Sequence, residues 1–272
     1  MKTISEQLAM FNEPDAGKQV LQYVNNGHLL CEEAQVKIFE LNDVLDIVQC
    51  LVKKEHSICV EAQIQMLKRE DAVALAKVYC GMFSLAEEAE LQMFEHVNVV
   101  ALVGVCCRKF SLGVEARAKM FKHPNAKEIV RIYIQSWPLG YADVVKIFDL
   151  EHPDDIILEY IRKRPLGVAT EAKLFELDRA QECVLEYIRK FPLYEENQVK
   201  LFEIDNFEEF LTEYIQHMRL KYQTLLLKWS PELPRNKEFY FLMIILDWYR
   251  ENKDNSESGL RSIVSEYFNG GI

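Results

Sequence analysis

Glycine and proline are scarce in this chain of 272 residues, which has ten of the first and eight of the second. The sequence contains no GxGxxG, GxxxxGKS/T, GxSxG or HExxH motif, so the common signatures of dinucleotide, phosphate, hydrolase and zinc-protease sites are missing. No side chain is thereby marked as catalytic. The sequence predicts a protein that is not an enzyme and that uses no cofactor.

Long hydrophobic runs are also missing. The longest apolar stretch runs from Phe239 to Leu246, which is well short of the roughly 20 residues that span a bilayer. The first 15 residues carry Glu6, Glu13 and Asp15 and have no apolar core of the kind found in signal peptides. These features predict a cytoplasmic protein that has no membrane partner.

Metal and disulfide patterns are absent. The seven cysteines include no CxxC pair, and the six histidines have no second ligand at a spacing that makes a convincing metal site. The sequence therefore predicts no metal. It also predicts that the cysteines act as small apolar side chains in a reducing compartment.

Positive charge is in short supply, since 32 lysines and arginines face 43 aspartates and glutamates. The resulting net charge of -11 and pI near 5.2 repel phosphate backbones unless a local basic patch overrides them. Nucleic acid is therefore an unfavourable partner for the chain as a whole.

What the sequence does contain is a repeat, visible as three columns of residues spaced by 27 or 28 positions. The first column is Phe11, Phe39, Leu67, Phe94, Phe121, Phe148, Phe175 and Phe202. The second is Tyr23, Leu51, Tyr79, Cys106, Tyr133, Tyr160, Tyr187 and Tyr214. The third is Leu30, Ile58, Leu85, Leu112, Leu139, Leu166, Leu193 and Leu220. A fixed period of this length is typical of a solenoid.

A single repeat reads as two short helices. In the unit Phe110–Trp137, apolar residues follow a helical period on both sides of His123-Pro124-Asn125, where the chain is expected to break. We therefore predict an all-α, right-handed α-α superhelix of about eight helical hairpins. The hairpins are expected near residues 3–28, 29–56, 57–82, 83–109, 110–137, 138–164, 165–191 and 192–218.

The repeat pattern decays after Met218, where a proline-bearing turn follows Trp229. The segment 219–272 contains the strongly apolar stretch Phe239–Arg250 and a last amphipathic helix. We expect this segment to be a helical cap on the open end of the stack and part of the same body as residues 1–218. An exposed aromatic docking site is the alternative interpretation.

Charge follows the expected helix ends. Glutamates open the first helices, and bases close the second helices, as expected for side chains that complement helix dipoles. The alternative is that the bases form an anion or phosphate track. The residues of that track would be Arg108, Arg162, Arg189 and Lys190.

The second helices also change character along the chain, at the position just before the tyrosine column. Val78, Val105 and Ile132 occupy it in earlier units, whereas Glu159, Glu186 and Glu213 occupy it later. Three further acids, Asp155, Glu182 and Glu209, stand four residues before these glutamates. Like charges at this spacing destabilise a helix slightly. The acids form either a binding stripe or a solvated face beside neighbouring bases.

The hairpin repeat resembles those of HEAT, armadillo and related α-solenoids, although their units are longer. The recurring phrases EAQVKIFEL, EAKLFEL with VLEYIRKFPL, and NQVKLFEI are similar to uncharacterised bacterial proteins built from very short helical repeats. The resemblance implies an α-superhelix and no particular activity. It transfers no functional residue to this chain.

The leading hypothesis is a scaffold that binds a protein or peptide on the concave face, which second helices usually line in such solenoids. That face would be apolar toward the amino end and acidic toward the carboxyl end, so a partner with apolar anchors followed by basic residues would suit it. One alternative is a nucleic-acid-directed protein or repair enzyme that uses the basic residues. Another is a structural or self-associating module.

Overall fold

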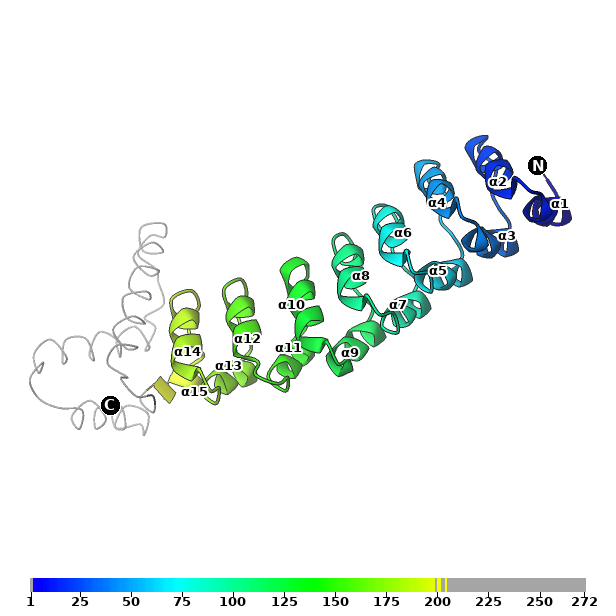
Figure 1. Cartoon of the computed structure of the whole chain (residues 1–272). Helices are drawn as coiled ribbons and strands as arrows, with labels where there is room; N and C mark the ends of the chain where they lie inside the picture. The colour runs from blue at the N-terminus through cyan, green and yellow to red at the C-terminus, as the bar shows by residue number, and fades with distance from the viewer. Residues whose placement is uncertain (1, 199, 202–203, 205–272) are drawn as a thin grey trace, which may run out of the picture. The chain divides into compact units, whose positions relative to one another are not determined.

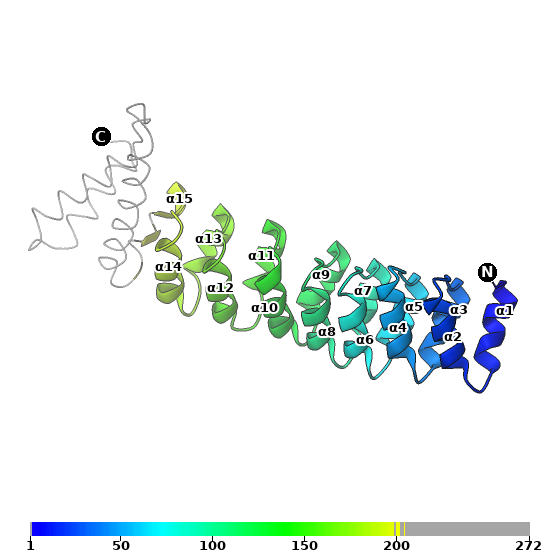
Figure 2. The same cartoon turned by 90° about the horizontal axis from the view of Figure 1, so that it is seen from above.

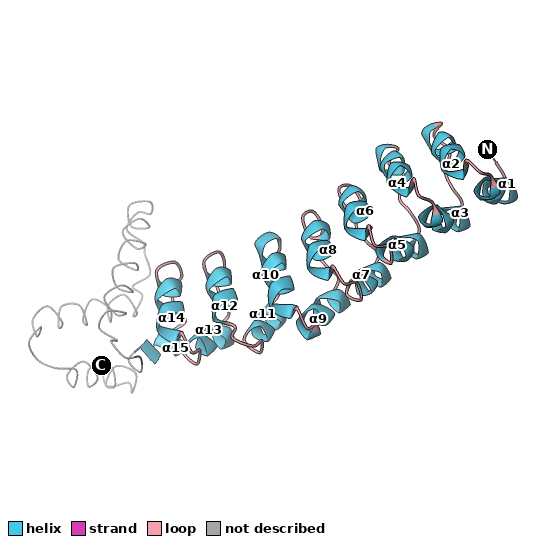
Figure 3. Cartoon of the chain, in the orientation of Figure 1, coloured by secondary structure: helices cyan, strands magenta, loops and turns pink. Residues whose placement is uncertain are grey.

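A computed structural model describes residues 2–198, 200–201 and 204. Over these residues the chain consists of helices joined by turns and contains no strand (Figure 3). This confirms the prediction of an all-α solenoid. The predicted cap, 219–272, lies outside the described residues, as do Phe202, Glu209 and Glu213. No described helix has the length and apolar character needed to cross a membrane.

Each of the first seven expected hairpins contributes a first and a second helix, and the described part of the eighth contributes its first helix. The first helices are α1 (Ile4–Ala9), α3 (Glu32–Lys37), α5 (Val60–Leu67), α7 (Glu87–Met93), α9 (Val114–Lys122), α11 (Tyr141–Ile147), α13 (Val168–Leu174) and α15 (Glu195–Gln198). The second helices are α2 (Ala16–Asn25), α4 (Val44–Lys53), α6 (Ala72–Tyr79), α8 (Val99–Cys106), α10 (Ala126–Ser136), α12 (Asp154–Ile161) and α14 (Ala180–Ile188). Two 3-10 turns, Met10–Asn12 and Ile38–Glu40, extend α1 and α3. The expected break at His123-Pro124-Asn125 falls between α9 and α10.

The chain divides into two compact units, Met1–Ile156 and Ile157–Ile272. In the first unit, α2, α4, α6, α8 and α10 pack in chain order in one row, and α1, α3, α5, α7, α9 and α11 form a second row (Figures 1 and 2). In the second unit, α13 packs against α14 and α15. Within each unit the helices thus contact their neighbours in the sequence, as in a stack of repeats.

The core follows the tyrosine and leucine columns, whose described members are all buried. The phenylalanine column is buried only in part, because Phe39, Leu67 and Phe94 are buried but Phe121 and Phe175 are half-buried. The column that is buried throughout stands one residue earlier. Its members, each at most 3% exposed, are Met10, Ile38, Met66, Met93, Met120, Ile147, Leu174 and Leu201.

Candidate functional site

A further column of side chains, which the sequence analysis did not single out, links successive repeats. It lies on the first helices and also recurs every 27 or 28 residues. We call it the joint column. Its members are Gln7, Gln35, Gln63, Glu90, Arg117, Val144 and Glu171.

The glutamines of the joint column bond two separate stretches of backbone. Gln35 Oε1 accepts a hydrogen bond from the backbone N–H of Cys59 at 2.6 Å, and Gln35 Nε2 donates to the backbone carbonyl of Leu30 at 3.0 Å. Gln7 and Gln63 make the same pair of bonds at their own positions. Each glutamine therefore joins the start of its own hairpin to the start of the next one.

Helix α1 shows why the backbone needs this bond. The N–H of Thr3, which precedes α1, is bound at 2.7 Å by Glu6 from the same helix in a capping box. The equivalent N–H groups before α3 and α5 belong to Cys31 and Cys59 and are bound by the preceding glutamines. A backbone N–H at such a position needs an acceptor. Before α1 the acceptor comes from the same helix, whereas before α3 and α5 it comes from the glutamine of the preceding hairpin.

The tyrosine column also contributes polar contacts to the joints. The hydroxyl of Tyr23 accepts from the N–H of Lys2 at 3.3 Å, and the hydroxyl of Tyr187 accepts from the N–H of Leu166 at 3.2 Å. Burial raises the pKa of Tyr79 to about 12, so this hydroxyl stays protonated. The column therefore anchors backbone groups as well as filling the core.

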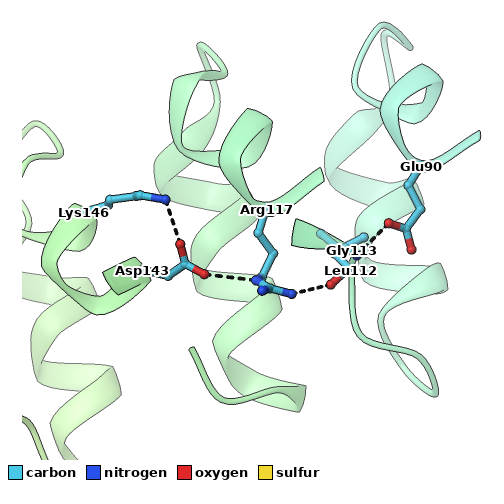
Figure 4. Close-up of polar contacts among 6 residues, drawn as sticks. All are labelled: Glu90, Leu112, Gly113, Arg117, Asp143 and Lys146. Atoms are coloured by element: carbon cyan, nitrogen blue, oxygen red, sulfur yellow. Dashed lines mark hydrogen bonds and ion pairs between the residues drawn. The ribbon is translucent and has the colours of Figure 1, made fainter. Parts of the chain in front are cut away.

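Glu90 replaces the glutamine at the joint between α7 and α9 (Figure 4). Its Oε2 atom accepts from the N–H of Gly113 at 2.7 Å, and the residue is 7% exposed. Burial raises the pKa of Glu90, and the charge of Glu87 raises it further. The hydrogen bond from Gly113 and the charge of Arg117 act in the opposite direction.

Arg117 occupies the next position of the joint column and makes a different kind of joint (Figure 4). It donates through Nη1 to the carbonyl of Leu112 at 2.6 Å, which corresponds to the glutamine bond. Its Nε pairs with Asp143 on α11 at 3.0 Å, and Lys146 pairs with the other oxygen of the same carboxylate at 2.8 Å. Hydrogen bonds from the two bases lower the pKa of Asp143 against the opposing effect of burial.

Each residue of the joint column faces one residue on the first helix of the next hairpin, and the type of that residue differs from joint to joint. These opposite residues form a partner column of Ala34, Ala62, Ala89, Ala116, Asp143, Thr170 and Asn197. The four alanines, all 0% exposed, follow the glutamines and Glu90. Asp143 follows Arg117, and Asn197 follows Glu171, so these two joint residues meet a polar partner, whereas Glu90 meets Ala116.

Glu171 forms the last described joint, between α13 and α15. The residue is 0% exposed. Its Oε1 atom accepts from the N–H of Tyr194 at 2.8 Å and from Asn197 Nδ2 at 2.9 Å. Its Oε2 atom is buried and has no hydrogen-bond partner of ordinary geometry. Burial raises the pKa of Glu171 to about 7, although the Tyr187 hydroxyl, Asn197 and the Tyr194 N–H all favour ionisation.

The apolar residues predicted for binding lie on the row of second helices. Val78, Val105 and Ile132 are half-buried on α6, α8 and α10. Helix α8 has the sequence VVALVGVC and is apolar on every side, yet Ala101 is exposed on it. A Cβ atom at Gly104 would lie 3.6 Å from Ile132 Cγ2, so the Ile132 side chain lies against α8. The outer apolar face is defined here by Val78, Val100, Ala101, Gly104, Val105 and Ile132.

Several acids and bases that the sequence analysis assigned to competing sites lie together in the second unit. Glu186 on α14 pairs with Arg162 at 3.4 Å and with Lys190 at 3.1 Å. Glu182 pairs with Arg179. Asp155 and Glu182 are exposed, and Glu159 is half-buried.

Two lysines at the ends of second helices bind backbone rather than open solvent. Lys109 Nζ donates to the carbonyl of Gly81, and Lys190 Nζ donates to the carbonyl of Arg162 at 3.1 Å. In both cases the carbonyl lies just beyond the preceding second helix, where carbonyl groups lack helical partners. Arg108 and Arg189 are exposed.

Several of the remaining described histidines and cysteines make local contacts. Among the described residues, no group of three or more histidines, cysteines or acids could hold a metal. His96 and His123 each accept, through Nδ1, the N–H two residues later. Cys80 and Cys106 lie 3.4 Å apart between their sulfur atoms, and their contact together with burial raises the pKa of Cys106.

The spacing of the joint column could have been found in the sequence, but its residue types differ too much to catch attention. Comparisons of the chain with known protein families, with curated proteins and with solved structures found no match.

Proposed function

We propose that this protein is a non-enzymatic scaffold that binds a protein or peptide on the outer apolar face. The observation that carries the proposal is the position of α8. A helix that is apolar on all sides is normally enclosed, whereas α8 has Ala101 exposed and Val100, Gly104 and Val105 half-buried. Repeat scaffolds use such extended surfaces for binding.

The outer apolar face favours a partner with apolar side chains. Each half-buried valine that a partner covers completely contributes up to about 1 kcal/mol to binding. The face continues from α8 to α10 because Ile132 lies against Gly104. A partner helix or strand could therefore contact two neighbouring repeats at once.

Basic residues in the partner are the second element of the proposal. The exposed acids Asp155 and Glu182 contribute negative charge that attracts them, although Glu182 already shares its charge with Arg179. Glu186 contributes less, because Arg162 and Lys190 both pair with it. Exposed ion pairs add at most about 1 kcal/mol each, so the apolar face carries most of the affinity.

The test is affinity capture with the full chain as bait, at low salt and at roughly 0.5 M salt, where screening removes exposed ion pairs. Val105→Asp is the test variant. Gln49→Asp is its control, because Gln49 is exposed on α4, outside the face. We expect one identified protein to be retained by the wild type and the control and lost from Val105→Asp. Equal capture by all three baits contradicts the proposal.

The two alternatives are outcomes of the same experiment. Salt-sensitive recovery of nucleic acid, lost when Arg108 and Arg189 are changed to glutamine, would favour the nucleic-acid interpretation. The pairing of Arg162 with Glu186 and of Lys190 with the Arg162 carbonyl weighs against it. Concentration-dependent light scattering that Val105→Asp abolishes would instead favour self-association.

A further inference from the structure

Four of the seven members of the joint column share one hydrogen bond, which Glu171 cannot make as a carboxylate. Gln7, Gln35, Gln63 and Arg117 each donate to the backbone carbonyl five residues before them. An ionised glutamate has no proton to donate. At Glu171 the corresponding carbonyl belongs to Leu166.

One oxygen of the Glu171 carboxyl group takes the place of the glutamine amide oxygen. Its Oε1 atom accepts from the N–H of Tyr194, the residue before α15, just as Gln35 Oε1 accepts from the N–H of Cys59 before α5. Its Oε2 atom is therefore left with the role of the amide nitrogen. That atom is buried and has no hydrogen-bond partner of ordinary geometry.

We propose that Glu171 carries a proton on Oε2 in the folded joint and donates it to the carbonyl of Leu166, and that losing this proton loosens the contact between α13 and α15. A neutral carboxyl group satisfies both the N–H of Tyr194 and the Leu166 carbonyl. An ionised one keeps a buried negative charge and cannot donate to that carbonyl, which is costly even though the Tyr187 hydroxyl, the Tyr194 N–H and Asn197 favour the charge.

The surroundings of Glu171 offer no cation. The groups that act on its carboxyl are the Tyr187 hydroxyl of α14, the Tyr194 N–H and the Asn197 amide of α15. The other charged side chains described on α13, α14 and α15 are Lys173, Glu182, Glu186 and Glu196. None of them is among the groups that shift the pKa of Glu171. Glu90 differs, since Arg117 lowers its pKa.

The balance of these effects places the transition near neutral pH. Burial raises the pKa of Glu171 from 4.5 to about 7. Since the folded state then binds the proton more tightly than the unfolded state, the joint weakens as pH rises above about 4.5 and changes no further above about 7. The second unit therefore contains a joint whose strength depends on pH in the range that cells use.

The test is amide hydrogen exchange of the full chain between pH 5 and pH 8, corrected for intrinsic exchange rates and read by mass spectrometry. In the wild type, protection of peptides covering α13 and α15 should fall by roughly 100-fold over this range, because each pKa unit is worth a factor of ten. In Glu171→Gln the same peptides should change by less than about threefold, because a glutamine does not titrate.

Glu176→Gln is the matched control, because Glu176 is exposed two residues after α13 ends. It should keep the wild-type profile. Identical profiles for the wild type and Glu171→Gln overturn the proposal. Should Glu171→Gln fail to fold, a carboxyl 13C titration of the wild type decides the question. A glutamate that titrates near pH 7, also in Glu90→Gln, supports the proposal, and titration of every glutamate below about pH 5.5 overturns it.

Discussion

Replacing Gln63 by leucine tests the joint column most simply. Gln63 is 6% exposed and makes three bonds. It accepts from the N–H of Ala86 at 2.7 Å and donates to the carbonyl of Ile58 at 3.1 Å and to the hydroxyl of Tyr79 at 3.3 Å. Leucine keeps most of the volume and removes all three, which leaves an N–H and a carbonyl without partners at the joint.

The expected cost follows from the unpaired groups. A buried polar group left without a partner costs about 1–3 kcal/mol, so two backbone groups together predict a loss of about 2–6 kcal/mol. The Tyr79 hydroxyl can rotate toward another partner and adds little. Since a native domain is stable by only about 5–15 kcal/mol, the loss should be large and should be greatest in the repeats on both sides of the joint.

The assay is urea denaturation of the full chain, with hydrogen exchange of α5 and α7 to locate the effect, since repeat stacks can unfold in parts. Gln65→Leu is the control on the same helix, because Gln65 bonds only Glu61, one turn earlier on the surface. The control should lose less than about 0.5 kcal/mol. Equal losses in Gln63→Leu and Gln65→Leu would refute the role of the joint column.

Two further predictions concern the joints on either side of Arg117. Asp143→Ala should cost about 1–3 kcal/mol of stability because it leaves the half-buried Arg117 with one partner fewer. Adding Arg117→Gln should restore part of the loss, because it recreates the pair of residue types seen at Gln63 and Ala89. Urea midpoints of the single and double variants measure both effects. Glu90→Gln should become more stable relative to the wild type as pH rises above 4.5, because the raised pKa of Glu90 makes the folded wild type lose stability in that direction. Thermal unfolding at pH 5 and pH 8 checks it, and a wild-type advantage that grows with pH would contradict it.

The repeat architecture could be predicted because large residues mark it at a constant spacing. Burial within the repeat was harder to predict, since Phe121 and Phe175 belong to the same column as the buried Phe94. Lys146 lies 5.4 Å from the centre of the Phe121 ring and Lys200 lies 5.9 Å from that of Phe175. A cation over an aromatic face is a favourable contact at a partly exposed site. These two phenylalanines therefore stay partly exposed, and the fully buried column is the one that stands one residue earlier.

The joints could not be predicted from residue types, because half of each joint is backbone. Gln35 meets the N–H of Cys59 and not its side chain, so the residue at position 59 carries no sign of the contact. Glu171 and Arg117, an acid and a base, fill the same position as Gln35, which hides the column from any search for similar residues. The predicted acidic stripe shows the reverse problem, since Glu186 and Arg162 were assigned to different sites before the structure paired them.

The central claim is that the outer apolar face binds a protein partner. A photo-crosslinking amino acid at Ala101, which is exposed on α8, tests it directly, with the same amino acid at the exposed Glu33 on α3 as the control. After irradiation in lysate and identification by mass spectrometry, one protein should be crosslinked at position 101 and absent at position 33. The account is contradicted if position 101 captures nothing or captures the same proteins as position 33.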